Sequence, residues 1–185
     1  MLRFLRLLPL VAALVLAGAP APAADLENTL YMDVPAGRVV IEMRPDLAPI
    51  TCAHIKELVR RGFYDGIVFH RVIGGFMAQT GDPKGDGTGG SGHPIKGEFS
   101  PTEKHVRGVV SMARTNDPNS GDSQFFIMFT DYPSLDGKYA IWGKVVSGME
   151  YIDAIKKGDP ARNGAVDHPD RIIKMQVAAD AEKKS

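Results

Sequence analysis

Residues 69–82 read Phe69-His70-Arg71-Val72-Ile73-Gly74-Gly75-Phe76-Met77-Ala78-Gln79-Thr80-Gly81-Asp82, and this stretch is the most informative in the 185-residue chain. Because residues two apart in a strand share a face, Gln79 is expected on the same face as Met77. Arg71 then arrives from the strand before the Gly74-Gly75 bend. A fixed cation, an apolar wall and an amide donor converge here without a nucleophile, a general base or a metal ligand. This combination suits a reaction that needs only polarisation and shape.

The rest of the chain reads as short strands separated by turn residues, with two helices. A first hairpin is predicted from Thr29 to Val34 and back through Val39 to Ile41. Further strands are predicted at 67–72, 76–80, 109–113, 124–129, 140–145 and 171–177. Helices are predicted at about 48–61 and 149–157, each with an apolar inward face and a glycine after it. This pattern predicts a mainly β fold, a closed or nearly closed antiparallel barrel whose open ends the two helices cap.

The first 23 residues have the composition of a secretory signal peptide. Arg3 and Arg6 precede an apolar run from Leu7 to Ala19, and Ala21-Pro22-Ala23 offers a small-x-small cleavage site, with the cut expected after Ala23. The alternative, an uncleaved membrane anchor, is disfavoured because the run is short of the ~20 apolar residues that a span needs and prolines interrupt it. We therefore expect export, to a bacterial periplasm, and a single domain over residues 24–185 with a polar, frayed tail from about residue 178.

Charge and cysteine content exclude several classes of function. Removing Arg3 and Arg6 lowers Lys plus Arg from 22 to 20 against 22 acids, so the mature net charge is 20 − 22 = −2. A nearly neutral chain with interspersed signs gives no electrostatic case for nucleic acid or for an anionic membrane. Cys52 is the one cysteine, so no internal disulfide is possible, and its place on a predicted helix indicates a small buried core residue.

The glycine-rich stretch at residues 85–90 matches two ligand-binding patterns only in part. Residues 85–90, Gly-Asp-Gly-Thr-Gly-Gly, satisfy a nucleotide-loop pattern, but His93-Pro94 follows where a helix should begin. As a calcium loop the stretch fails too, because Lys84 and His93 stand where oxygen ligands are needed. A flexible glycine loop beside the surface of Gln79 remains.

The five histidines give no metal-binding spacing, so we expect no metal and no cofactor. His70 alternates with Arg71 and should point into the core, with its hydrogen bonds satisfied.

The second informative segment is Gly121-Asp122-Ser123-Gln124-Phe125-Phe126-Ile127. On a strand, Gln124 and Phe126 share one face and Phe125 and Ile127 the other. Taken alone, Phe126 reads as a core residue. Ser123 is not in a nucleophile elbow, so nucleophilic hydrolysis has no support.

Together the segments resemble cyclophilin-type peptidyl-prolyl cis-trans isomerases. The resemblance rests on residues 69–73, Gly75-Phe76-Met77 with Gln79, 87–90, Ser111-Met112-Ala113, 123–127, 135–138 and 143–145, and it runs in order from about Leu30 to Val177. It implies a closed eight-stranded antiparallel β-barrel capped by two α-helices. It also implies an isomerase that accelerates rotation of X-Pro peptide bonds.

The resemblance also implies roles for individual residues. Arg71 matches the catalytic arginine. The pocket for the proline ring is matched by Phe76, Met77, Phe126 and Leu135. The groups that hold the peptide chain are matched by Gln79, Ala113 and Arg114, with Thr115 and Gln124 lining the groove beside the pocket, and Tyr139 stands where many animal members have a histidine.

One departure from the family pattern has a consequence for inhibitors. Ser134, just before Leu135, stands where many animal members carry a tryptophan whose indole N–H contacts the drug cyclosporin. Serine lacks that aromatic surface, so weak cyclosporin binding is expected.

The expected partners are proline-containing peptides and unfolded or folding exported proteins, with no nucleic acid, no stable membrane insertion and a monomeric state. A proline-peptide-binding chaperone with little catalysis is the alternative. The presence of Arg71 favours the enzyme, because a pure binder has no need of the arginine.

Overall fold

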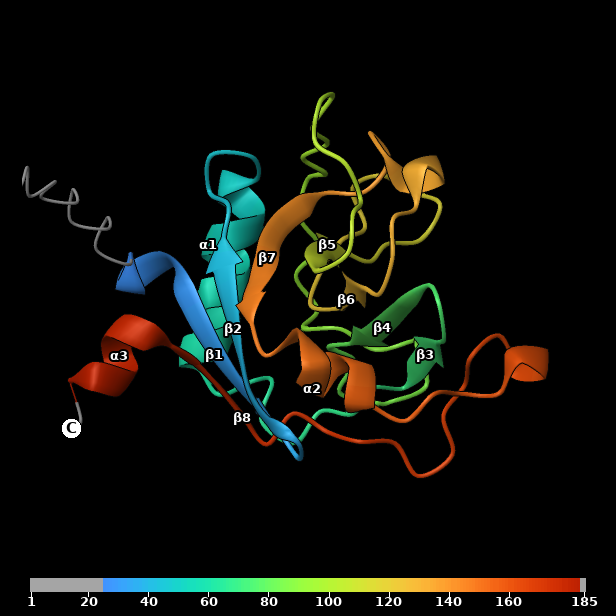
Figure 1. Cartoon of the computed structure of the whole chain (residues 1–185). Coiled ribbons are helices and arrows are strands. Elements are labelled where there is room, and N and C mark those ends of the chain that lie inside the picture. The colour runs from blue at the N-terminus through green and yellow to red at the C-terminus, as the bar shows by residue number, and fades with distance from the viewer. Residues whose placement is uncertain (1–24, 184–185) are drawn as a thin grey trace, which may run out of the picture.

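The computed structural model describes residues 25–183, so the predicted signal peptide lies outside the described residues. Eight strands and three α-helices follow one another in the order shown in Figure 1. They are β1 Thr29–Val34, β2 Gly37–Met43, α1 Pro49–Arg60, β3 Arg71–Ile73, β4 Met77–Thr80, β5 Val109–Met112, β6 Phe125–Met128, β7 Ile141–Ser147, α2 Met149–Ala154, β8 Lys174–Val177 and α3 Ala178–Glu182. All eight predicted strands and both predicted helices are confirmed, with ends that differ by a few residues.

The strands form one antiparallel sheet in the order β3-β4-β6-β5-β7-β2-β1-β8. The expected closed barrel is wrong in this respect, because within residues 25–183 the sheet is curled but open, and β3 and β8 are its edges. The segments that precede these two strands meet through an isolated bridge between Val68 and Arg171 and through irregular backbone bonds such as Gly66 N–H to Ile172 O, 2.8 Å. A three-residue β3 is too short to extend this contact into a ladder.

The two faces of the curled sheet have separate apolar clusters. The concave face carries the main core, to which α1 contributes Ile55, Leu58 and Val59 and α2 contributes Ile152. The opposite face of β4, β5, β6 and β7 carries a second, smaller cluster built on Met77, Val109, Phe126, Met128 and Ile141. The candidate site described below is built on this second cluster.

Helix α1 begins with Pro49 and packs against β7 and β8. Its first turn is capped from a distant loop, because the Glu98 carboxylate accepts the Ile50 N–H at 3.0 Å, the Thr51 N–H at 2.8 Å and the Thr51 hydroxyl at 2.8 Å. Carboxylates at a helix N-terminus satisfy free N–H groups and favour the dipole. The helix is thus tied to the long loop that borders the candidate site.

The C-terminal tail differs from the expectation. Residues from 178 onward were expected to be frayed, but Ala178–Glu182 form α3, and Ala178 is fully buried. Arg60 of α1 explains part of this order, since its Nε donates to Asp180 Oδ2 at 2.8 Å. Figure 1 shows α3 beside the start of β1.

Candidate active site

One row of side chains crosses four neighbouring strands on the outer face of the sheet. Arg71 on β3 lies opposite Gln79 on β4, Gln79 lies opposite Phe126 on β6, and Phe126 lies opposite Ser111 on β5. Since side chains alternate along a strand, members of such a row share a face. The sheet register therefore brings together residues that are up to 55 positions apart in the chain.

The Arg71 guanidinium is held by three hydrogen bonds. Its Nη1 donates to Gln79 Oε1 at 3.1 Å, its Nε donates to the Asn163 carbonyl at 3.0 Å, and its Nη2 donates to Asn163 Oδ1 at 3.0 Å. Burial lowers the pKa of Arg71, but a guanidinium remains charged at neutral pH. Of its five N–H hydrogens, two are uncommitted among residues 25–183.

Asn163 is not among the residues predicted for the site. It lies in a turn after the short helix Pro160–Arg162 and adopts a left-handed conformation with φ of 54°, which asparagine tolerates better than most residues. An Arg-Asn-Gly turn carries a weak local signal for that conformation. Nothing in the sequence places the turn next to Arg71, 92 positions earlier.

Arg71 forms part of the wall of a cavity of about 110 Å³. The cavity is lined by Arg71, Phe76, Met77, Gln79, Ala113, Arg114, Phe126, Leu135 and Tyr139. Phe126 and Met77 are buried, so their side chains form a rigid floor. The structure thus gathers nine of the eleven predicted site residues around one small cavity with an apolar floor and two cations, Arg71 and Arg114.

Aromatic contacts fix the cavity's rim. Tyr139 meets Phe126 edge to face at 5.7 Å between ring centroids, and the Arg114 guanidinium carbon lies 4.7 Å from the centre of the Tyr139 ring. Phe76 packs on Tyr132 at 4.4 Å. Such pairs stabilise a fixed ring orientation beyond their area burial.

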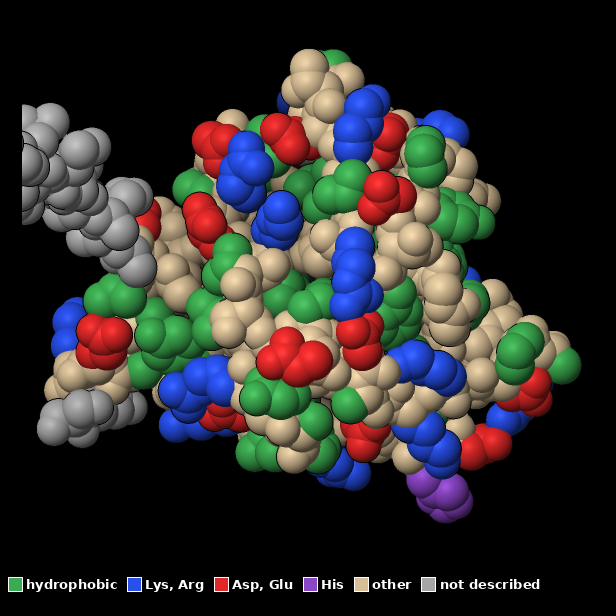
Figure 2. Space-filling model, viewed as in Figure 1, with side chains coloured by type: hydrophobic (Ala, Val, Ile, Leu, Met, Phe, Trp, Pro, Cys, Tyr) green, Lys and Arg blue, Asp and Glu red, His purple; other side chains and the backbone are tan. Residues whose placement is uncertain are grey.

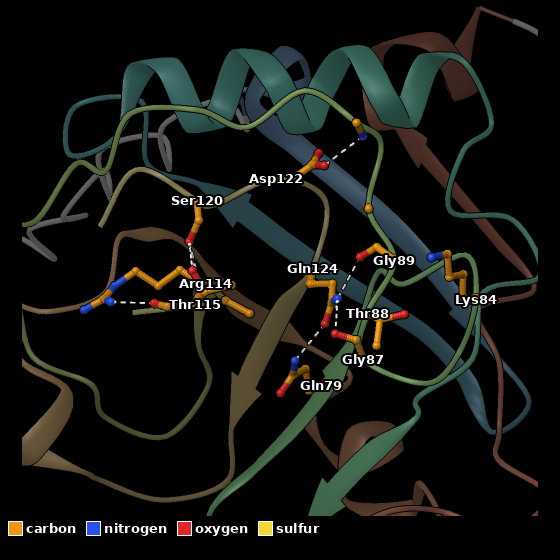
Figure 3. Close-up of a pocket in the computed structure, with 13 residues that line it drawn as sticks. Gln79, Lys84, Gly87, Thr88, Gly89, Arg114, Thr115, Ser120, Asp122 and Gln124 are labelled. Atoms are coloured by element: carbon orange, nitrogen blue, oxygen red, sulfur yellow. Dashed lines mark hydrogen bonds between the residues drawn. The ribbon is translucent and has the colours of Figure 1, made fainter. Parts of the chain in front are cut away.

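A second, larger cavity of about 550 Å³ adjoins the first and shares Gln79, Ala113 and Arg114 with it. The remaining two predicted site residues, Thr115 and Gln124, line this second cavity (Figure 3). Gln79 Nε2 donates to Gln124 Oε1 at 2.9 Å, and Gln124 Nε2 donates to the carbonyls of Gly87 and Gly89. A continuous chain of hydrogen bonds therefore runs from Arg71 to the glycine loop.

The glycine loop is tied down rather than free, which differs from the expectation. Burial opposes ionisation of Asp82, but the N–H groups of Lys84, Gly89 and Gly87 outweigh it and lower the Asp82 pKa. Asp122 accepts the Gly92 N–H at 2.9 Å and the Ser91 hydroxyl. A Cβ at position 89 would lie 2.0 Å from Asp82 Oδ1, so glycine is needed there for close approach.

His70 is buried as expected, but the described part of the structure does not show the hydrogen bonds expected of its ring. Neither ring nitrogen has a hydrogen-bond partner among residues 25–183. Burial lowers the His70 pKa, so the neutral ring is favoured, which reduces the energetic cost of leaving it unpaired.

Within residues 25–183, no cluster of three or more His, Cys, Asp or Glu side chains could hold a metal ion. In the same part of the chain, no helix combines the length and the apolar character that crossing a membrane requires. The face shown in Figure 2 carries Lys and Arg side chains interspersed with Asp and Glu.

The chain matches known sequences over nearly all of the described part. Residues 29–177 match the family described as cyclophilin type peptidyl-prolyl cis-trans isomerase/CLD. A probable peptidyl-prolyl cis-trans isomerase of Brucella suis is 55% identical over 174 residues, covering 88% of each chain. Peptidyl-prolyl cis-trans isomerase-like 3 of Homo sapiens is 47% identical over 133 residues, covering 70% of this chain and 81% of the human one.

Solved structures of cyclophilins have a fold similar to that of this chain. A cyclophilin from Hirschia baltica superposes with a TM-score of 0.75 at 30% identity, covering 84% of this chain and 76% of its own. A Cryptosporidium parvum cyclophilin, crystallised in the presence of the dipeptide Ala-Pro, superposes with a TM-score of 0.73 at 29% identity, covering 80% and 98%.

Proposed function

The chain belongs to the cyclophilin-type peptidyl-prolyl cis-trans isomerases, and we propose that it isomerises X-Pro bonds by using Arg71 to stabilise the twisted amide electrostatically. Rotation about the bond before proline is opposed by amide resonance, with a barrier of ~18–20 kcal/mol. The uncatalysed exchange takes on the order of tens to hundreds of seconds. A group that binds the twisted amide better than either planar form accelerates the exchange.

The observation that carries this proposal is the way in which hydrogen bonds hold the Arg71 guanidinium at the cavity. Three hydrogen bonds to Gln79 and Asn163 hold its guanidinium on the wall of the 110 Å³ cavity. When the amide twists, its nitrogen regains a lone pair and becomes a hydrogen-bond acceptor. The two uncommitted guanidinium hydrogens supply donors for that nitrogen and for the neighbouring carbonyl, without reorganisation at the moment of reaction.

The apolar walls supply the second half of the mechanism. Phe76, Met77, Phe126 and Leu135 would hold the proline ring still while the chain before it turns. Their low polarity also strengthens the field of the arginine. A 10⁴-fold acceleration requires only about 5.5 kcal/mol of differential stabilisation, which is within the reach of a few preorganised donors.

The larger cavity is proposed to hold the chain next to the proline. Gln79 and Gln124 present amide groups to it, and Ala113, Arg114 and Thr115 line it. The substrates are proposed to be exported proteins that fold slowly at X-Pro bonds.

The test is the cis-to-trans exchange of a short X-Pro peptide, measured by NMR with the mature protein and with Arg71→Ala. We expect strong acceleration by the unmodified protein and its loss in the variant, with peptide binding retained. Acceleration by Arg71→Ala equal to that of the unmodified protein would contradict the role of Arg71. Peptide binding without acceleration by the unmodified protein would favour a proline-binding chaperone.

Export is a separate proposal and rests on residues 1–23. Expression of the full-length chain in a Gram-negative host should give a periplasmic product that begins at Ala24, as read by intact-mass measurement. A cytoplasmic product that retains Met1–Ala23 would contradict it. Light scattering on the mature protein would check the predicted monomer.

A further inference from the structure

Behind the proline cavity lies a histidine for which the proposed mechanism has no use. The His105 side chain has no exposed surface, and its ring stacks on Phe126 with 6.3 Å between centroids and 22° between planes. It meets Tyr139 edge to face at 6.5 Å. The rings of Phe126 and Tyr139, which line the cavity, therefore both pack against the His105 imidazole.

Both nitrogens of His105 have polar partners. Nδ1 lies 3.2 Å from Asp136 Oδ1, and the backbone N–H of His105 donates to that same oxygen at 2.8 Å. Nε2 lies 3.1 Å from Ser111 Oγ, and Ser111 Oγ lies 3.0 Å from the Ala140 carbonyl. The imidazole thus joins a loop carboxylate to the row of residues that includes Arg71.

Counting hydrogens identifies the tautomer. An ionised Asp136 only accepts, so the hydrogen of that contact sits on Nδ1. In a neutral imidazole, Nε2 then accepts, and the one hydroxyl hydrogen of Ser111 must point to it. The Ala140 carbonyl stays satisfied, because the Met112 N–H also donates to it at 2.9 Å. In the imidazolium, Nε2 donates to Ser111, and the Ser111 hydroxyl turns towards Ala140.

The network reaches the opposite wall of the cavity through the loop. Asp136 follows Leu135, which lines the cavity, and the His105 carbonyl accepts the N–H of Tyr132 at 2.8 Å. Tyr132 in turn packs on Phe76. His105 is therefore bonded to both ends of the turn that presents Leu135, while its ring supports Phe126.

We propose that His105 is a positioning residue for proline binding, which as the neutral Nδ1–H tautomer fixes the spacing between Phe126 and the Leu135 turn. This inference rests on the proposed function of the cavity. It goes beyond that function because it gives a role to His105, which can titrate, whereas the proposed catalytic residue Arg71 is always charged.

The charges around His105 set the direction of its pH dependence. Burial lowers the His105 pKa, and the bond and charge of Asp136 only partly oppose it. Asp136 is also approached by Lys104, whose Nζ lies 3.4 Å from Oδ2, and Tyr139 faces the ring from the end of the turn. The pKa of His105 in the folded protein lies below the ordinary value of 6.5. The neutral form therefore dominates at neutral pH and is lost as the pH falls through this lowered pKa.

The first experiment reads the tautomer directly. Long-range ¹H–¹⁵N spectra of the unmodified protein at pH 7.5 should show His105 protonated at Nδ1 and unprotonated at Nε2. An Nε2–H tautomer or an imidazolium at this pH would overturn the proposal. This measurement does not depend on catalysis, so it decides the network even if the protein proves to be a binder that does not accelerate exchange.

The second experiment is the pH profile of kcat/KM for an X-Pro peptide between pH 5 and 8. We expect the unmodified protein to show a fall below pH 6.5. His105→Gln should remove that inflection and lower the plateau by about tenfold, because small misplacements of binding groups are costly. Asp136→Asn keeps the accepting oxygen but removes the charge that raises the His105 pKa, so its inflection should move to lower pH.

The matched control is His93→Gln, which alters an exposed histidine and should leave the profile unchanged. An unchanged plateau or a persisting inflection in His105→Gln would overturn the positioning role while leaving the proposed function intact. If His105→Gln does not fold, the pH profile of Asp136→Asn tests the proposal instead. An inflection in kcat/KM that stays at the same pH or moves to higher pH in Asp136→Asn would overturn the proposal.

Discussion

Arg71 and Gln79 face each other across β3 and β4, and Arg71 Nη1 donates to Gln79 Oε1 at 3.1 Å. This bond fixes the orientation of the Gln79 amide, because only its oxygen can accept from a guanidinium. The Gln79 nitrogen must then point to Gln124, whose own nitrogen must point to the carbonyls of Gly87 and Gly89 (Figure 3). Arg71 thus sets the orientation of the two amide side chains, Gln79 and Gln124, that line the larger cavity.

Arg71→Lys should reduce kcat/KM by about 10²-fold, even though the charge is kept. An ammonium is a point donor that cannot serve Gln79, Asn163 and the substrate in one plane, and loss of one preorganised donor at an active site typically costs about 10²–10³-fold. Peptide affinity measured by calorimetry should change much less than kcat. Full activity of the lysine variant would show that the planar fork is not needed.

Two substitutions at Asn163 separate its contact from its backbone conformation. Asn163→Gly keeps the left-handed backbone and the carbonyl that accepts from Arg71 Nε but removes Oδ1, so kcat/KM should fall by about tenfold with little loss of stability. Asn163→Ala removes the same contact and adds about 1–2 kcal/mol of backbone strain. NMR exchange and urea unfolding measure the two effects.

Asn119→Ala is the control for these variants, since its amide oxygen accepts the Gly97 N–H and Asn119 does not line the cavity of Arg71. Equal activity of Asn163→Gly and the unmodified protein would mean that Gln79 alone suffices to hold the guanidinium.

Glu98→Ala should lower the free energy of unfolding by about 1–2 kcal/mol, because it removes the cap from the first turn of α1. Urea unfolding measures this loss. The matched control is Glu57→Ala, which removes an exposed ion pair with Arg61 at 3.5 Å and should cost no more than about 0.5 kcal/mol. Similar losses in both variants would mean that the cap contributes no more than a surface charge.

Cyclosporin should bind weakly. Ser134 is exposed in the short helix Pro133–Leu135, directly before Leu135 at the rim of the cavity, and a hydroxymethyl group offers no aromatic surface to the drug. Ser134→Trp should tighten binding by at least about tenfold, since a packed aromatic side chain is worth on the order of 1–3 kcal/mol. Calorimetry would contradict this account if the unmodified protein bound with a low-nanomolar Kd.

Cys52 should be inert to thiol reagents in the folded protein. The residue is buried and its thiol donates to the Trp142 carbonyl, and burial raises its pKa to about 12. The thiolate fraction at pH 8 is therefore about 10⁻⁴. Labelling followed by mass spectrometry should be slow in buffer and should accelerate in urea, at the rate of unfolding.

Ser134→Cys provides the exposed control and should add one rapidly reacting thiol. Rapid stoichiometric labelling of the unmodified native protein would mean that the α1 region opens readily.

The eight strands and the helices α1 and α2 were predictable because their signals are local, whereas α3 was not predicted. Alternation in 69–82 and 121–127 gives the faces of β3, β4 and β6, and a glycine or proline directly follows β1, β3, β4 and β7. The openness of the sheet was not predictable, since it depends on how far the edge strands β3 and β8 can pair. That length is decided by the irregular segments before them.

The sequence by itself determined the order of the strands along the chain and the faces on which their residues lie, because strand periodicity is a property of neighbours. The roles expected of Arg71, Gln79 and Phe126 came from the resemblance of their motifs to the cyclophilin family. Only the tertiary structure decided that Asn163 holds Arg71, that Glu98 caps α1 and that His105 stands between Phe126 and Asp136. Each of these contacts joins segments that are 20 or more positions apart. A hydrogen bond needs its partners within about 3.2 Å, and only packing of the whole sheet and its loops sets distances of that size between remote residues.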